Sequence, residues 1–144
     1  MKKSSIINIL LIEDNPGDID LTLEAFQKTS TPNNVFVVED GEEAIAFLKK
    51  EGQYENMCTP DIILLDLNLP KIDGRTVLAE IKSDESLKHI PVIVLTTSKS
   101  EDDILKSYKL HANCYISKPT GIKQFWEMVS YIESFWFKIV RLPS

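Results

Sequence analysis

The chain has 144 residues, of which 43% are hydrophobic and 26% charged, and this suits one globular domain with a buried core. The 16 Lys and Arg residues against 22 Asp and Glu residues give a net charge of −6, which argues against a surface that binds nucleic-acid phosphates. The chain has only two cysteines and no apolar run near the ~18 residues that a membrane helix needs, so we expect a cytoplasmic protein that does not enter a membrane.

Five short apolar runs, separated by longer stretches of helical period, predict alternating strands and helices. A regular alternation on one chain implies right-handed crossovers, and therefore an α/β fold with a parallel sheet covered by helices on both faces. The predicted strands are residues 7–12, 35–38, 61–66, 91–96 and 113–117.

Each predicted strand is followed by a helical pattern with a recognisable start. Asn15 is a candidate N-cap with Pro16 in the first turn, and Asp40 with Glu43 forms a variant of the capping box. Gly74 begins the third helix and Ser100 caps the fourth. The residues predicted to face the sheet are Ile19, Leu23 and Phe26, then Ala44, Ile45 and Leu48, then Val77, Leu78 and Ile81, then Ile104, Leu105 and Tyr108, and finally Ile122, Phe125, Val129, Ile132 and Trp136.

Polar side chains gather at the carboxyl ends of the predicted strands. Glu13 and Asp14 follow the first strand, Asp66 closes the third, Thr96 closes the fourth, and Lys118 follows the fifth. In parallel sheets these ends meet at one edge, where reactive residues collect. Two carboxylates about 4 Å apart repel by ~4 kcal/mol, so the cluster needs a cation. The pattern predicts a Mg²⁺ site with a carboxylate that attacks phosphoryl groups, beside a lysine and a hydroxyl that bind phosphate oxygens.

These residues resemble the receiver domains of two-component response regulators, in four motifs that occur in the family's order. The matching segments are Glu13-Asp14-Asn15-Pro16, the loop from Asp66 to Gly74, Thr96, and Lys118-Pro119. The resemblance implies a doubly wound, flavodoxin-like (βα)5 fold with strand order 2-1-3-4-5. It covers residues 6–136, so we expect one domain over residues 1–144, with a C-terminal tail at residues 137–144.

The resemblance also implies which residues bind the metal ion and the phosphoryl group. Asp66 would be the phosphoacceptor. Mg²⁺ would be ligated by Asp14, Asp66 and the backbone carbonyl of Asn68, with Glu13 acting directly or through water.

Three further positions carry the family's phosphate-binding and switch roles. Thr96 and Lys118 would bind the phosphoryl oxygens, and Tyr115 would be the aromatic residue that moves when the Thr96 hydroxyl is drawn inward. The peptide bond between Lys118 and Pro119 would be cis, as it usually is in the family.

The implied function is a signalling switch that a sensor histidine kinase phosphorylates, with Mg²⁺ as cofactor. It would act on a downstream protein or a phosphotransfer protein without an output domain, and its only chemistry would be its own phosphorylation and dephosphorylation. Residues 64–71, 94–98 and 113–119 resemble, more narrowly, the single-domain regulators that work with bacterial phytochromes.

Two other functions fit parts of the pattern. A haloacid-dehalogenase-like Mg²⁺ phosphatase also uses an aspartate, a hydroxyl and a lysine, but that family carries Asp-x-Asp after its first strand, and here Asn68 lies two residues after Asp66. A phosphate-independent interaction module with a receiver fold would be expected to lack a site residue, and none is missing.

The last predicted helix is apolar on more than one face. Met128, Tyr131 and Phe135 form a second stripe beside the one that faces the sheet. We expect this stripe, with residues 139–142, to join two copies in a homodimer or to dock a kinase; the alternative is that the tail folds back over it.

Overall fold

The computed structural model describes residues 6–96, 112, 114–119 and 121–139, without the side chains of Thr96 and residues 137–139. Five parallel strands form one sheet in the order β2-β1-β3-β4-β5. The strands are β1 (Ile7–Ile12), β2 (Asn33–Val38), β3 (Ile62–Asp66), β4 (Val92–Thr96) and β5 (Cys114–Ser117). The predicted parallel sheet and its strand order are confirmed.

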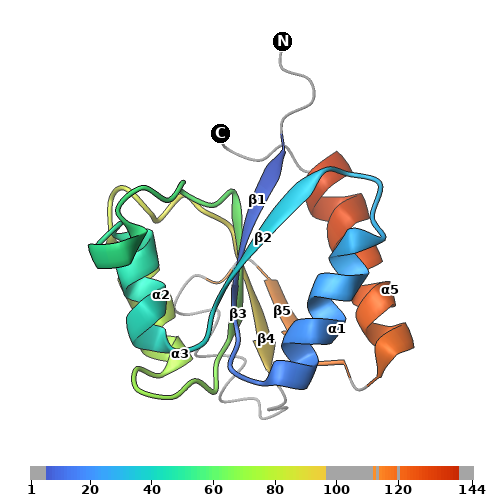
Figure 1. The fold of residues 1–144 in the computed structure, drawn as a ribbon, viewed down its shortest axis with the longest axis horizontal. Coiled ribbons are helices and arrows are strands. Elements are labelled where there is room, and N and C mark those ends of the chain that lie inside the picture. Colours follow the sequence, from blue (N-terminus) through green and yellow to red (C-terminus); the bar gives the residue numbers. More distant parts are fainter. Residues whose placement is uncertain (1–5, 97–111, 113, 120, 140–144) are drawn as a thin grey trace.

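Helices cover both faces of the sheet, with α1 and α5 on one side and α2 and α3 on the other (Figure 1). They are α1 (Pro16–Gln27), α2 (Gly41–Leu48), α3 (Gly74–Ser83) and α5 (Ile122–Ile132), with a short 3-10 helix η1 (Gly52–Tyr54) and a π-helical segment η2 (Glu133–Ile139). The helix predicted to begin at Ser100 lies outside the described residues. Among the described residues, no helix is long and apolar enough to cross a bilayer.

The central strands are buried on both faces, which is why they appear in the sequence as continuous apolar runs. Successive side chains of a strand point to opposite faces of the sheet. In β1, Leu10 and Ile12 pack in the cluster under α2 and α3, whereas Ile9 and Leu11 pack in the cluster under α1 and α5. The core is therefore two layers separated by the sheet, and the carboxyl ends of the strands are left for polar residues.

Side-chain caps fix the starts of the first three helices. The Asn15 side chain accepts the N–H of Asp18 at 3.0 Å, and the Asp40 side chain accepts the N–H of Glu43 at 2.8 Å. The Glu43 carboxylate accepts the hydroxyl of Tyr54 at 2.8 Å, so only the Asp40 half of the predicted capping box is observed. The cap of α3 is Asp73, directly before the predicted Gly74.

The buried face of α5 differs from the predicted one at two residues. Phe125, Val129 and Ile132 are buried as predicted, but Ile122 is 44% exposed and Met128 only 6%. Met128 lies three residues after Phe125 and four before Ile132, which places it on the same helical face as those residues. The expectation that Met128 is exposed beside Tyr131 and Phe135 is therefore wrong.

A buried carboxylate fixes η2 to the turn between α1 and β2. Glu133 is 9% exposed, and its Oε2 atom accepts hydrogen bonds from the backbone N–H and the hydroxyl of both Ser30 and Thr31, all at 2.9 Å. Hydrogen bonds to a charged acceptor are stronger than neutral ones. This one side chain therefore joins the C-terminal segment to the end of α1.

Replacing Glu133 by Ala is expected to lower the free energy of unfolding by about 2 kcal/mol. The partly buried N–H and hydroxyl groups of Ser30 and Thr31 would then lose their charged acceptor. Urea unfolding followed by circular dichroism measures this loss. Glu127→Ala, on the exposed side of α5, is the matched control and is expected to change stability by less than about 0.5 kcal/mol. Equal unfolding midpoints for the two variants would contradict the structural role of Glu133.

Candidate functional site

The topology brings the predicted polar residues to one edge of the sheet. Glu13 and Asp14 directly follow β1, Asp66 is the last residue of β3, and Lys118 directly follows β5. The backbone of Thr96 ends β4 opposite Ser117 of β5, next to the strand that carries Asp66. The side chain of Thr96 lies outside the described part, so its contact with a phosphoryl group stays a prediction.

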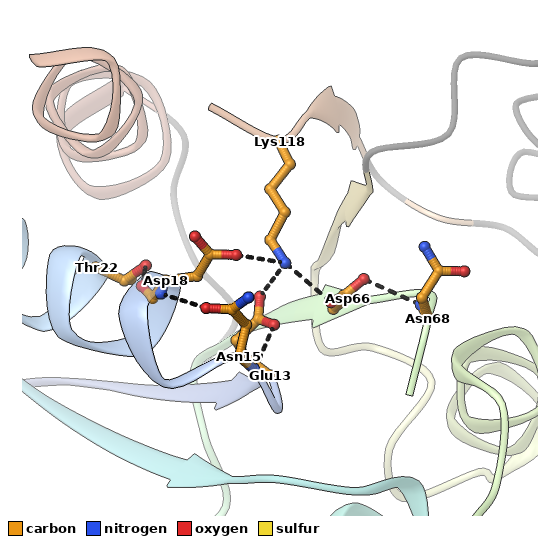
Figure 2. Close-up of polar contacts among 7 residues, drawn as sticks. All are labelled: Glu13, Asn15, Asp18, Thr22, Asp66, Asn68 and Lys118. Carbon is orange, nitrogen blue, oxygen red and sulfur yellow. Dashed lines mark hydrogen bonds and ion pairs between the residues drawn. The ribbon is translucent and has the colours of Figure 1, made fainter. Parts of the chain in front are cut away.

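Lys118 lies at the centre of this edge and contacts three carboxylates (Figure 2). Its Nζ atom is 2.8 Å from Oε1 of Glu13, 2.8 Å from Oδ2 of Asp18 and 3.1 Å from Oδ2 of Asp66. The lysine side chain is only 8% exposed, so these ion pairs are largely shielded from water. The sequence did not single out Asp18, which lies in the first turn of the helix that begins at this edge.

Burial and charge shift the pKa values of Glu13 and Lys118 in the same direction for different reasons. Burial raises the pKa of Glu13, the hydrogen bond from Lys118 opposes this, and the charge of Asp66 raises it again, to about 7. For Lys118, burial lowers the pKa, but the hydrogen bonds to Asp18 and Glu13 and the charge of Asp66 outweigh burial and raise it. At neutral pH the Lys118 ammonium is therefore charged, whereas the Glu13 carboxyl group gains or loses its proton near neutral pH.

The carboxylates of Glu13, Asp14 and Asp66 form a cluster that can hold a metal ion. One oxygen from each lies within 4.8 Å of the others. Glu13 and Asp66 are buried and Asp14 is exposed, so the cluster opens to solvent on one side. An all-oxygen donor set with an open side fits a hard divalent ion that keeps some of its water.

Backbone donors hold two of these carboxylates in place. The N–H of Asn15 donates to Oε2 of Glu13 at 3.1 Å, and the N–H of Asn68 donates to Oδ1 of Asp66 at 3.0 Å. The backbone of Asn68 is thus beside Asp66, where its carbonyl is predicted to bind metal. Both loops contribute to the preorganisation of the acidic cluster.

At Gly74 the backbone of the loop that follows Asp66 packs closely against the backbone at the end of β3. The N–H of Gly74 donates to the carbonyl of Leu67 at 3.0 Å. A Cβ atom at Gly74 would lie 2.5 Å from the carbonyl oxygen of Asp66 and 2.6 Å from Cα of Leu67, so only glycine fits.

The same loop contacts the start of α2 through close backbone packing and an ion pair. A Cβ atom at Gly41 would lie 2.1 Å from the carbonyl oxygen of Ile72. Lys71 adopts a left-handed conformation with φ of 65°, and its Nζ atom lies 3.5 Å from Oδ2 of Asp40, the N-cap of α2. The position of Asp66 is therefore supported by a loop that packs between two helix starts.

The remaining predicted switch residue, Tyr115, lies on the edge strand β5. It is half-buried against the cluster under α2 and α3. It also lines a groove of about 480 Å³ along β5, together with Tyr131 and Phe135. The described residues contain no cis peptide bond, so the predicted cis bond between Lys118 and Pro119 is wrong for this structure.

Comparison with known proteins agrees with this geometry. Residues 9–130 match the model of the response regulator receiver domain. The chain is 51% identical over 136 residues to response regulator Rcp1 of Synechocystis sp., covering 94% of this chain and 92% of Rcp1. It is 39% identical over 137 residues to the probable methanogenesis regulatory protein FilR2 of Methanothrix harundinacea, covering 94% of this chain and 87% of FilR2.

Solved structures of similar proteins have the same fold. The phosphorylated cyanobacterial phytochrome response regulator RcpA is 54% identical, with a TM-score of 0.94 and coverage of 97% of this chain and 100% of RcpA. The Mn²⁺-bound form of Rcp1 is 50% identical, with a TM-score of 0.91 and coverage of 96% of this chain and 99% of Rcp1. Because the receiver-domain model covers most of the chain and these relatives are about half identical over nearly its whole length, the chain belongs to the family of response regulator receiver domains.

Proposed function

We propose that this receiver domain is a signalling switch that accepts a phosphoryl group on Asp66 from a sensor histidine kinase. The observation that carries the proposal is the position of the Lys118 ammonium, 3.1 Å from Oδ2 of Asp66 and 2.8 Å from Oε1 of Glu13. A cation at this distance can donate to an oxygen of a phosphoryl group on Asp66 as negative charge builds up.

The transfer needs one bond to form and one to break. A carboxylate oxygen of Asp66 attacks phosphorus, the bond from phosphorus to the nitrogen of the donor histidine breaks, and that nitrogen keeps the electron pair and takes up a proton. Hydrolysis removes the phosphoryl group: water attacks phosphorus, inorganic phosphate is released, and the Asp66 carboxylate is restored. The chain would thereby promote only its own phosphorylation and dephosphorylation. The cytoplasm is the proposed compartment, because a histidine kinase takes its phosphoryl group from ATP.

Glu13, Asp14, Asp66 and the backbone carbonyl of Asn68 are the proposed ligands of Mg²⁺. Their oxygen atoms suit this ion, and the crystal structure of the relative Rcp1 contains Mn²⁺. When bound, the ion would neutralise negative charge that develops on the phosphoryl oxygens.

Thr96 and Tyr115 are the proposed switch residues. A phosphoryl group on Asp66 would recruit the Thr96 hydroxyl, and Tyr115 would then move. Because Tyr115 lines the groove along β5 with Tyr131 and Phe135, its movement would reshape a surface that a target or phosphotransfer protein can contact. The relative RcpA is described as a phytochrome response regulator, which makes a bacterial phytochrome the proposed kinase partner.

Mass spectrometry after incubation with Mg²⁺ and acetyl phosphate, or an active histidine kinase, tests this function. We expect a phosphoryl group on the peptide that contains Asp66. No label with an active donor would favour a phosphate-independent interaction module instead. Rapid turnover of an unrelated phosphate ester would favour a phosphatase.

The exposed aromatic residues at the end of α5 and in η2 are the proposed dimer contact. Tyr131 is 76% exposed and Phe135 48%, and they lie one helical turn apart. Light scattering after size exclusion is expected to give a dimer mass for the wild type and a monomer mass for the Tyr131→Ala/Phe135→Ala variant. Ile122→Ala, an exposed apolar residue of the same helix, is the matched control and is expected to stay dimeric. A monomer mass for the wild type would exclude the dimer and leave two roles for this face, kinase docking or contact with the C-terminal tail folded back over it.

A further inference from the structure

Asp18 is a partner of Lys118 that lies outside the acidic cluster. Its Oδ2 atom is 2.8 Å from Nζ of Lys118, as close as any oxygen of Glu13 or Asp66. The acidic cluster consists of Glu13, Asp14 and Asp66 and does not include Asp18. The two kinds of carboxylate therefore share one ammonium group (Figure 2).

The backbone of Asp18 is fixed on both sides. Its N–H donates to the Asn15 side chain at 3.0 Å, and its carbonyl accepts the hydroxyl of Thr22 at 2.7 Å. The Asp18 side chain is 23% exposed, so it is the most solvent-accessible of the three carboxylates that contact Lys118. A short side chain on a capped helix turn is a rigid support for a flexible lysine.

An ammonium group has three N–H donors, and Lys118 has three carboxylate partners at hydrogen-bonding distance. A divalent ion at the acidic cluster would compete with the ammonium for the carboxylate groups of Glu13 and Asp66, because both groups belong to that cluster. Asp18 would keep its oxygens for the lysine. Of the three partners, Asp18 is thus the one that remains available when the cluster binds a metal ion.

We propose that Asp18 is a positioning residue, which holds the Lys118 ammonium beside Asp66 when a metal ion occupies the acidic cluster. The proposal rests on the proposed phosphoacceptor function, because the lysine is held where a phosphoryl group on Asp66 would lie. Asp18 acts through Lys118 and does not itself touch the phosphoryl group. Its loss would leave the ammonium free to turn toward solvent, and preorganisation of the site would be reduced.

A double-mutant cycle with Asp18→Asn and Lys118→Met, measured by urea unfolding without Mg²⁺ and with saturating Mg²⁺, tests the contact independently of activity. We expect the unfolding equilibrium constant of the double variant to differ at least threefold from the product of the single effects under both conditions. Lys118→Gln, which keeps an N–H donor, serves as the second variant if the methionine variant does not fold. Loss of this coupling in Mg²⁺, or the lack of any stabilisation of the wild type by Mg²⁺, would overturn the proposal.

The rate of labelling by acetyl phosphate connects the contact to the chemistry. Asp18→Asn is expected to be labelled at least threefold more slowly than Asp20→Asn, the matched control, which removes the same charge from an exposed position of the same helix. Equal rates for the two variants would overturn the role of Asp18 while leaving the proposed function intact. A wild type that takes no phosphoryl group would contradict the proposed function itself, and with it the role of Asp18 in the transfer.

Discussion

In an Asp66→Asn variant, no phosphoryl group is expected on the chain after incubation with Mg²⁺ and acetyl phosphate. Asparagine has nearly the same shape, and its amide oxygen can still accept the N–H of Asn68, which donates to Oδ1 of Asp66 at 3.0 Å. A neutral amide oxygen is a far weaker nucleophile than a carboxylate and cannot form a stable acyl phosphate. Mass spectrometry of the intact protein measures the label directly.

Asp73→Asn is the matched control for this variant. Asp73 is an exposed carboxylate seven residues further along, where it caps α3, and asparagine caps helices equally well. This control is expected to be labelled like the wild type. Label that persists in Asp66→Asn would assign the phosphoryl group to another residue and refute the proposed acceptor.

Replacing Gly74 by Ala is expected to lower the free energy of unfolding by about 3 kcal/mol, at the upper end of the range for overpacked sites. The new methyl group would meet the carbonyl oxygen of Asp66 at 2.5 Å, and Cα and the carbonyl oxygen of Leu67 at 2.6 and 2.8 Å. All three are backbone atoms of the acceptor strand and its loop, so no side chain can rotate away. Urea unfolding measures the loss.

Gly17→Ala is the matched control, because Gly17 also lies in the first turn of a helix. A Cβ atom there would meet only Oδ1 of Asn15, at 3.4 Å, which is an ordinary contact. Alanine also restricts the unfolded chain more than glycine does, so this variant is expected to be unchanged or stabilised by about 0.5 kcal/mol. Similar losses for both variants would show that the close approach at Gly74 does not determine stability.

The continuous apolar runs predict the five strands of the sheet. The residues at which a strand begins and ends depend on backbone pairing, which the pattern of side chains does not show. The first strand was predicted with its observed bounds, Ile7–Ile12. The second begins two residues earlier than predicted, at Asn33, because that residue pairs through its backbone with Ile7. In α5, counting one apolar stripe placed Met128 outside the core, although the helix buries a wider face.

The sequence predicts those residues of the candidate site that the sheet topology brings together. The rule that reactive residues collect at the carboxyl ends of parallel strands grouped Glu13, Asp66 and Lys118, which the structure places in contact. It could not identify Asp18, because an acidic residue in the first turn of a helix is ordinary and favourable for the helix itself. What distinguishes Asp18 is its distance to Lys118, a hundred residues later in the chain.

Both ends of α1 contact residues that lie about a hundred positions later in the chain. At its first turn Asp18 pairs with Lys118, and just past its last turn Ser30 and Thr31 donate to Glu133. Both contacts close loops of about a hundred residues, which is entropically the costliest kind of closure in a chain of this size. Because Lys118 follows β5 and Glu133 follows α5, these two contacts at the ends of α1 can form only after those elements have been synthesised.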